Sequence, residues 1–208
     1  MKILKGWLQK HIVETLPSDE TIEQALILKS SEVEGIEKIK IDGKDDTVFD
    51  LKVLPDRAHY MLSHRGVAYD LCAVLNLTLK SFKSLFPQTG NDIKINVESD
   101  LCNRYSATLI TGIDNTASPE WLRNALKALG ARSISGIVDA TNYSMYDTGQ
   151  PLHAFDAEKV IGGITVRFAK EGEILDTLDG SANPSKQIKL QKHQLVIADD
   201  KGPLALAG

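Results

Sequence analysis

Apolar positions in the amino-terminal part of the chain follow first a helical period and then the period of a strand. Residues 1–12 predict a short amphipathic helix, weakened by Gly6, whose apolar positions are Ile3, Leu4, Trp7, Leu8 and Ile12. A second helix is predicted after Pro17, with Ser18 as its capping residue and an apolar face of Ile22, Ala25, Leu26 and Leu28. Residues 33–41 and 48–54 then alternate around Asp42-Gly43, which is typical of a β-hairpin.

A third helix is predicted after Ser63, which precedes a run with one apolar side: Val67, Ala68, Leu71, Cys72, Val74 and Leu75. The simplest interpretation of the charged residues at its entrance is that they form caps or surface ion pairs, and these residues are Asp56, Arg57, His59, His64 and Arg65. Residues 80–91 contain Pro87 and Gly90 and form the best candidate for a domain boundary. We therefore predict one domain at residues 1–80 and another at 91–208.

The second predicted domain mixes short strands with two helices. Residues 93–97 and 105–113 alternate as strands, and a helix is predicted with Ser118 as N-cap, Pro119 at its first position and Gly130 as its stop. Further strands are expected at residues 164–168, 174–178 and 195–198, with a turn at Asp179-Gly180. The sequence predicts an α+β fold in which a small helix-hairpin module precedes a mixed-sheet domain.

Polar residues cluster in the stretch SGIVDATNYSMYDTGQPLHAFD, residues 135–156. Thr141 and Asn142 are predicted at the start of a helix that Gly149-Gln150-Pro151 ends, so that they and His153 face one place. An imidazole can orient or deprotonate a water near neutral pH, which makes His153 the first catalytic candidate. From the residues alone, structural roles remain open for all three, because short polar side chains also cap helices and bond nearby backbone.

Composition limits the classes of function. The net charge is −4, so bulk electrostatics do not favour nucleic-acid binding, and any bound RNA requires a local basic patch or a partner. No apolar run approaches the ~20 residues of a membrane span, so no membrane contact and a cytoplasmic location are expected. Cys72 and Cys102 lack the paired spacing of metal ligands, so reduced structural thiols and no metal site are expected.

The sequence of residues 135–156 closely resembles the editing domain of the bacterial phenylalanyl-tRNA synthetase beta chain. That family's signature has a valine-aspartate, a threonine-asparagine-tyrosine, and a glycine-glutamine-proline followed by a histidine-alanine-phenylalanine-aspartate run. The segment PDRAHYMLSHRGVAYDLCAVL is similar to the closing part of the family's first module. The resemblance spans nearly the whole chain, without the tRNA-binding barrel that many members carry inserted in that first module.

The resemblance implies a pocket that hydrolyses tyrosine wrongly attached to tRNA for phenylalanine. His153 and Thr141 are the implied catalytic residues, and the implied substrate-binding residues are Arg132, Asn142, Pro151, Ala207 and Gly208. The family's carboxylate that reads the tyrosine hydroxyl lies beyond the position of Gly208, so we expect an incomplete editing domain here. No cofactor is implied for this part, whereas ATP and Mg²⁺ are implied for the complete enzyme.

The resemblance also implies partners: tRNA, and an alpha chain in a heterotetramer of two alpha and two beta chains. Two alternative functions remain open at this point. One is a free-standing aminoacyl-tRNA deacylase, against which the synthetase-like segment of residues 1–77 argues. The other is a non-catalytic structural or RNA-binding module, which the missing carboxylate favours and against which the joint presence of Thr141, Asn142, Pro151 and His153 argues.

Overall fold

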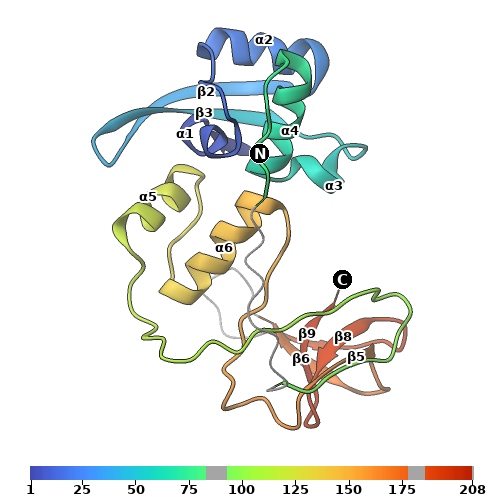
Figure 1. Ribbon diagram of the computed structural model, residues 1–208. Helices are drawn as coiled ribbons and strands as arrows, with labels where there is room; N and C mark the ends of the chain where they lie inside the picture. Colours follow the sequence, from blue (N-terminus) through green and yellow to red (C-terminus); the bar gives the residue numbers. More distant parts are fainter. Residues whose placement is uncertain (83–92, 178–185, 208) are drawn as a thin grey trace. The chain divides into compact units, whose positions relative to one another are not determined.

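The computed structural model describes residues 1–82, 93–177 and 186–207 (Figure 1). Its helices and strands in chain order are β1 Lys2–Leu4, α1 Lys5–Leu8, η1 Gln9–His11, α2 Asp19–Lys29, β2 Glu32–Ile41, β3 Lys44–Lys52, α3 Ala58–Met61, α4 His64–Leu75, β4 Ile95–Val97, α5 Glu120–Ala128, α6 Gly136–Thr148, β5 Ile164–Phe168, β6 Ile174–Thr177, β7 Lys186–Lys189, β8 Leu195–Ala198 and β9 Pro203–Leu206. This mixture confirms the predicted α+β class.

The chain folds into two compact units. The first contains Met1–Lys83 and Asp114–Ala154, and the second contains Ser84–Ile113 and Phe155–Gly208. Helices α5 and α6 are therefore grouped with the amino-terminal strands. The division of the sequence into modules at 1–80 and 91–208 stays a prediction, and Pro87 and Gly90 of its connector lie outside the described residues.

The first unit is built on an antiparallel sheet with the strand order β1-β3-β2. The predicted hairpin is confirmed: β2 and β3 form the long ribbon of Figure 1, which turns at Asp42 and Gly43, both with positive φ. Helix α2 packs on β2 and on α4, and α1 packs on β3. Between them lies a core whose largest members, Phe49, Leu8 and Ile22, are fully buried.

The prediction of a helix over residues 1–12 is wrong for its first part. Lys2–Leu4 forms strand β1, which pairs with Asp50, Phe49 and Val48 of β3, and the helical turn begins only at Lys5. Pairing with the edge of β3 satisfies the backbone N–H and C=O groups that a helix would otherwise satisfy locally. Tertiary context therefore overrides the local apolar period.

The amino terminus of α2 is fixed by charge as well as by its predicted cap. Ser18 accepts a hydrogen bond from the Thr21 amide, which confirms the cap. Next to it, Asp19 accepts hydrogen bonds from Lys5 at 2.6 Å, from Thr47 at 2.7 Å and from Lys38. Burial opposes the charge, but these donors hold the pKa of Asp19 well below its ordinary value. Leu28, predicted on the apolar face, is instead 76% exposed.

The second unit contains a four-stranded sheet with the order β4-β5-β8-β9, in which β4 is parallel to β5 and the other pairs are antiparallel. Strands β6 and β7 form a separate hairpin, and Val196, Ala198 and Leu175 lie in the small core. The predicted strands at residues 164–168 and 195–198 are confirmed. Asp179-Gly180 lies outside the described residues.

The strand predicted at residues 105–113 is wrong, because no element forms there. Ile110 and Ile113 are 66% and 50% exposed, so the alternating pattern does not bury a face. An extended segment becomes a strand only where a neighbouring strand pairs with its backbone. The alternation of apolar and polar residues within the segment does not show whether such a neighbour exists. Separately, within the described residues no helix is long and apolar enough to cross a bilayer.

Gly66, in the first turn of α4, is predicted to tolerate no side chain. A Cβ placed there would lie 1.8 Å from the Tyr60 carbonyl oxygen, whereas a Cβ at Gly35 would meet nothing within 4 Å. We expect Gly66→Ala to lower the free energy of unfolding by about 1–3 kcal/mol, measured by urea denaturation, because backbone must move. The matched control Gly35→Ala should change it by less than about 0.5 kcal/mol. Equal effects would contradict this close packing.

Candidate functional site

Helix α6 carries Thr141 and Asn142, but it does not begin with them. The helix spans Gly136–Thr148, so the predicted start at Thr141 is wrong and both residues lie in its middle. Gly149 ends the helix with φ 81° and donates its N–H to the Met145 carbonyl oxygen at 2.8 Å, which confirms the predicted stop.

A buried carboxylate organises the entrance of α6. Asp139 is fully buried and accepts hydrogen bonds from the hydroxyls of Ser118 and Ser133, and from the Ile134 amide at 2.9 Å. Burial acts to raise the pKa of Asp139, but these hydrogen bonds outweigh it and hold the pKa below its ordinary value. The prediction that Ser118 caps α5 is therefore wrong, since its hydroxyl binds Asp139 and Pro119 takes the N-cap position.

A second carboxylate anchors the other end of α6. Asp147 Oδ1 accepts hydrogen bonds from Trp7 Nε1 at 2.6 Å and from His11 Nε2 at 2.7 Å. Burial acts to raise the pKa of Asp147, whereas the donors from His11 and Trp7 lower it, and the net shift is downward. One face of the Trp7 indole stacks on Tyr143 at 4.1 Å between ring centroids. These contacts attach α6 to α1 and η1.

His64 completes this anchor, and its prediction as a cap or a member of a surface ion pair is wrong. The side chain is fully buried and stacks on Trp7 at 4.0 Å between ring centroids. Its Nε2 accepts from the Leu4 amide at 3.1 Å, so the proton must be on Nδ1, which donates to the Tyr146 carbonyl oxygen at 2.8 Å. Burial lowers the pKa of His64 to about 3, more strongly than that hydrogen bond and the Asp147 charge raise it.

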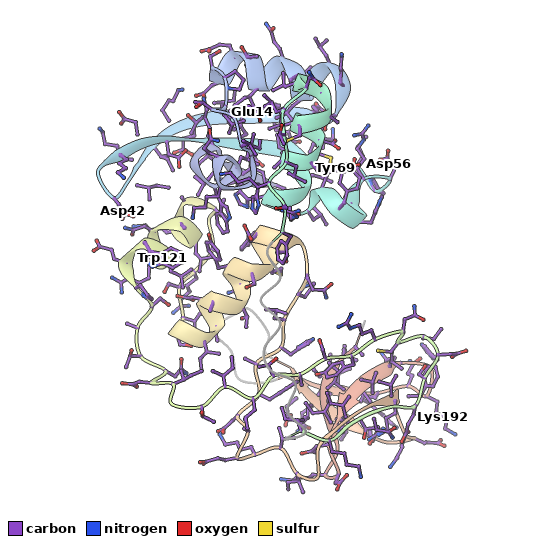
Figure 2. All side chains as sticks on the ribbon, in the orientation of Figure 1. Glu14, Asp42, Asp56, Tyr69, Trp121 and Lys192 are labelled. Carbon is purple, nitrogen blue, oxygen red and sulfur yellow. The ribbon has the colours of Figure 1, made fainter. Side chains whose placement is uncertain are left out.

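Helix α5 joins the same assembly. Figure 2 shows Trp121 on α5 and Asp42 at the tip of the β2–β3 hairpin. Asn124, one turn after Trp121, donates to Asp42 Oδ1 at 2.6 Å, and the Trp121 ring meets Tyr143 edge-on at 5.4 Å. The predicted apolar face of α5 is confirmed at Leu122 and Leu126, which are buried.

The anchored and unanchored faces of α6 are set by helical geometry. Asp139, Tyr143, Tyr146 and Asp147 recur at three- and four-residue intervals and share the anchored face. Thr141 lies two positions from Tyr143, which places it about 160° around the helix, on the opposite side. Its hydroxyl donates to the Val138 carbonyl oxygen at 2.7 Å, so the oxygen keeps its acceptor capacity for a ligand.

Three of the remaining predicted site residues flank α6 along the chain, and two do not. Arg132 is exposed in the connection from α5 to α6, and Pro151 and His153 are exposed in the segment that follows Gly149. Thr141, Asn142, Arg132, Pro151 and His153 all belong to the first unit. Ala207 belongs to the second unit, where its amide donates to the Leu195 carbonyl oxygen at 2.9 Å. Gly208 lies outside the described residues.

Sequence reasoning missed the residues that position α6, namely Asp139, Asp147, Trp7, His11 and His64. A signal was present for Asp139, which interrupts the apolar run of Ile137, Val138 and Ala140 and lies three positions before Asn142. For Trp7, His11 and His64 the sequence held no such signal, since their partners on α6 lie more than 80 positions away.

The Asp139 network is expected to contribute strongly to stability. Asp139→Ala removes the acceptor shared by two hydroxyls and an amide, and we expect the free energy of unfolding to fall by about 3 kcal/mol. The matched control Asp45→Ala removes a surface pair whose carboxylate is 85% exposed, and should change stability by less than about 0.5 kcal/mol. Urea denaturation of both variants measures the difference. Similar losses would mean that the Asp139 network carries no special weight.

His64 predicts a pH dependence with a defined sign. Its pKa is about 3 in the folded chain against an ordinary value of 6.5, so the unfolded chain binds this proton first as pH falls. The stability is therefore complete above pH ~6.5 and falls by up to about 1.4 kcal/mol per pH unit toward pH 4. Denaturation midpoints from pH 7.5 to 4 should show this slope in the wild type and a smaller one in His64→Gln. An unchanged slope would exclude His64 as its source.

Comparisons with known proteins agree with the sequence resemblance. The beta subunit of phenylalanine–tRNA ligase from Chromobacterium violaceum is 42% identical over 170 residues, which cover 80% of this chain and 21% of that protein. The same subunit from Aquifex aeolicus is 38% identical over 207 residues, covering 91% of this chain and 26% of that protein. The chain thus spans only a fifth to about a quarter of the length of these relatives.

A solved structure and a domain family also match. An amino-terminal fragment of the phenylalanyl-tRNA synthetase beta subunit from Pyrococcus horikoshii aligns with the whole chain and 60% of its own length, at 14% identity and a TM-score of 0.46. That likeness is too remote to support a conclusion. The B3/4 domain matches residues 101–208, which include α5, α6 and the four-stranded sheet's last three strands. On this match over more than half of its residues, the chain belongs to the B3/4 domain family.

Proposed function

We propose that this chain is part of a phenylalanine–tRNA ligase beta subunit and carries its editing site, which hydrolyses tyrosine wrongly attached to tRNA for phenylalanine. The relatives that share about 40% of its residues are named as beta subunits of that ligase. The observation that carries the proposal is the arrangement of α6. One face of the helix is fixed by Asp139 and Asp147, and the opposite face presents the Thr141 oxygen as an acceptor.

The chemistry needed is hydrolysis of an ester. A water oxygen attacks the carbonyl carbon, the bond from that carbon to the ribose oxygen breaks, and the ribose oxygen takes up a proton. In the proposed site His153 orients the water or the terminal ribose, and Thr141 and Asn142 hydrogen-bond the aminoacyl or adenosine end. Arg132, exposed before α6, approaches a phosphate or a ribose oxygen. Pro151, exposed after the end of α6 in the same unit, completes this part of the proposed lining. That Ala207 and Gly208 also belong to the site stays a prediction.

A ligase that attaches phenylalanine needs a second, hydrolytic site because the pocket that selects the amino acid has a physical limit. An apolar pocket for phenylalanine rejects an analogue that merely adds a hydroxyl by only ~100-fold. Fidelity beyond that ratio requires a pocket that recognises the added hydroxyl and removes the wrong product. An anchored helix suits this task, because misplacement of catalytic groups by about 1 Å already costs ~100-fold in rate.

The same proposal implies partners and a place of action. The beta subunit would act with an alpha chain, two of each forming the enzyme, and with tRNA as substrate in the cytoplasm. ATP and Mg²⁺ would serve aminoacylation in the complete enzyme. Within the described residues, no group of three or more acidic, histidine or cysteine side chains could hold a metal ion.

We test the proposal with His153→Ala in the complete ligase. Hydrolysis of tyrosyl-tRNA should slow by ~10- to 100-fold, because an oriented proton acceptor or donor is lost. Charging with phenylalanine should be nearly unchanged, and both rates follow from release and incorporation of labelled amino acid. The matched control is His193→Ala, an exposed histidine between β7 and β8, which should alter neither rate. Equal loss of both activities in His153→Ala would contradict an editing role.

A further inference from the structure

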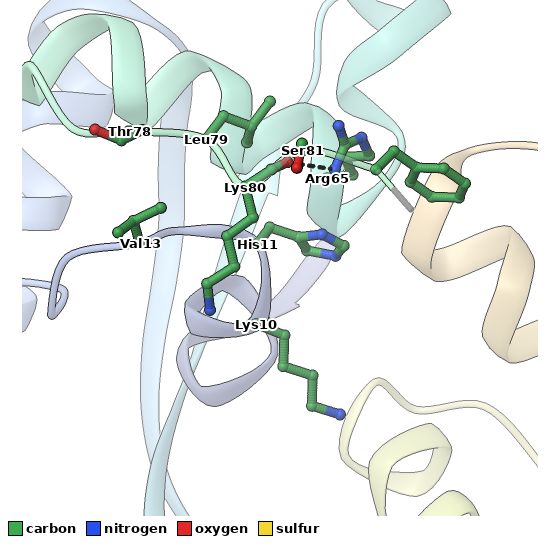
Figure 3. A pocket seen from close by; sticks show the side chains of 9 residues that line it. Lys10, His11, Val13, Arg65, Thr78, Leu79, Lys80 and Ser81 are labelled. Atoms are coloured by element: carbon green, nitrogen blue, oxygen red, sulfur yellow. Dashed lines mark hydrogen bonds between the residues drawn. The ribbon is translucent and has the colours of Figure 1, made fainter. Parts of the chain in front are cut away.

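A basic hollow in the first unit lies outside the residues of the proposed editing site. It has a volume of about 640 Å³ and is lined by Lys10, His11, Val13, Arg65, Thr78, Leu79, Lys80, Ser81 and Phe82 (Figure 3). This volume is in the range of pockets that hold small ligands. All nine residues belong to the same compact unit, so the hollow does not depend on how the two units are placed.

The walls of the hollow are fixed by backbone pairing. The segment that follows α4 runs beside η1, and the two are joined by hydrogen bonds from the Lys80 amide to the His11 carbonyl oxygen at 2.8 Å and from the Val13 amide to the Thr78 carbonyl oxygen at 2.9 Å. Ile12 and Leu79 form a bridge between the same segments. A site whose walls are already ordered loses little conformational entropy when a ligand binds.

The charge of the hollow is opposite to that of the whole chain. Of its nine lining residues three are cations, Lys10, Arg65 and Lys80, and none is acidic, in a chain of net charge −4. Two carboxylates that contact lining residues make their own hydrogen bonds: Glu14 accepts from the Thr78 amide and hydroxyl, both at 2.7 Å, and Asp147 accepts from His11 and Trp7. Positive charge concentrated in a concave surface favours a polyanion.

Two of the cations remain available to a ligand. Lys10 directs its ammonium away, donating to the Tyr143 hydroxyl at 3.0 Å among the rings of Trp7, Trp121 and Tyr143. Lys80 is exposed, and its ammonium donates a long hydrogen bond of 3.3 Å to the Gln9 carbonyl oxygen. The Arg65 guanidinium donates a similarly long hydrogen bond of 3.4 Å to the Lys80 carbonyl oxygen. Bonds of this length are readily exchanged for a phosphate.

An exposed aromatic ring adds a second kind of recognition. Phe82 is 60% exposed, and the Arg65 guanidinium lies 5.2 Å from its ring centroid. An apolar ring stacked beside a cation is the arrangement on which unpaired bases stack, and neighbouring lysines then take the backbone phosphates. The carboxylates of an acidic peptide would use the cations but not the exposed ring.

We propose that this hollow binds an unpaired stretch of RNA, with phosphates at Lys80 and Arg65 and one base stacked on Phe82. The inference goes beyond the proposed function, because every residue involved lies outside the 101–208 match and outside the proposed hydrolytic site. On this proposal the amino-terminal part of the chain contacts RNA separately from the proposed editing site. It does not require that the chain hydrolyse anything.

The test measures binding of a fluorescein-labelled oligouridylate of ~12 nucleotides to the 208-residue chain by anisotropy. We expect Lys80→Glu and Phe82→Ala each to weaken binding by ~5-fold or more, and Phe82→Leu to weaken it almost as much, because Leu keeps the apolar surface but not the stacking face. Lys80→Glu should also reduce the slope of log affinity against log salt by about 0.7 or more. Lys29→Glu, an exposed lysine at the end of α2, is the charge-matched control and should weaken binding less than ~2-fold.

Each other outcome overturns the inference. No binding by the wild type at low salt, or equal weakening by Lys29→Glu, would leave no specific RNA site in the hollow. Displacement of the RNA by polyglutamate as effectively as by unlabelled oligouridylate would assign the hollow to acidic protein segments. Thermal unfolding of each variant separates lost binding from lost folding. Hydrolysis of tyrosyl-tRNA, measured independently, reports on the proposed function alone, so failure of one proposal leaves the other standing.

Discussion

The Asp147 carboxylate is the interaction on which the arrangement of the first unit depends. A single oxygen accepts hydrogen bonds from Trp7 and His11, and the Trp7 ring is held between His64 and Tyr143. Five residues from three separate stretches of the chain are thereby tied to one point. Helix α6 is consequently fixed by side chains that come before α2 and at the start of α4.

Such a network is strong only when it is complete. In the low dielectric of a protein interior, each satisfied hydrogen bond strengthens and each unsatisfied group becomes costly. Among the described residues, no buried side-chain nitrogen or oxygen lacks a hydrogen-bond partner. His64 illustrates the constraint, because its single tautomer is dictated by the Leu4 amide on one side and the Tyr146 carbonyl on the other. The network therefore specifies one position of α6 along and around its axis.

The sequence predicted the features whose causes are local. The caps at Ser18 and Ser63, the stop at Gly149 and the hairpin at Asp42-Gly43 all depend on residues a few positions apart, and all are found. Features with distant causes were missed. β1 forms only because β3 offers an edge, the start of α6 is held because Asp139 binds Ser118 from 21 positions earlier, and His64 is buried because Trp7 covers it. The candidate site shows the same division. Its residues could be predicted from the sequence of residues 135–156, but the contacts of Trp7, His11 and His64 that hold α6 could not.

The chain passes between its two compact units at three points, near residues 83, 113 and 154. Neither unit is thus a continuous stretch, and the B3/4 match itself draws on both. A chain shortened to residues 91–208 would keep α5 and α6 but lose Trp7, His11 and His64, leaving the Tyr143 and Tyr146 side of α6 without its partners. The amino-terminal strands and helices therefore supply the packing partners that hold the helix bearing Thr141, and the two segments of the first unit form one structural unit only together.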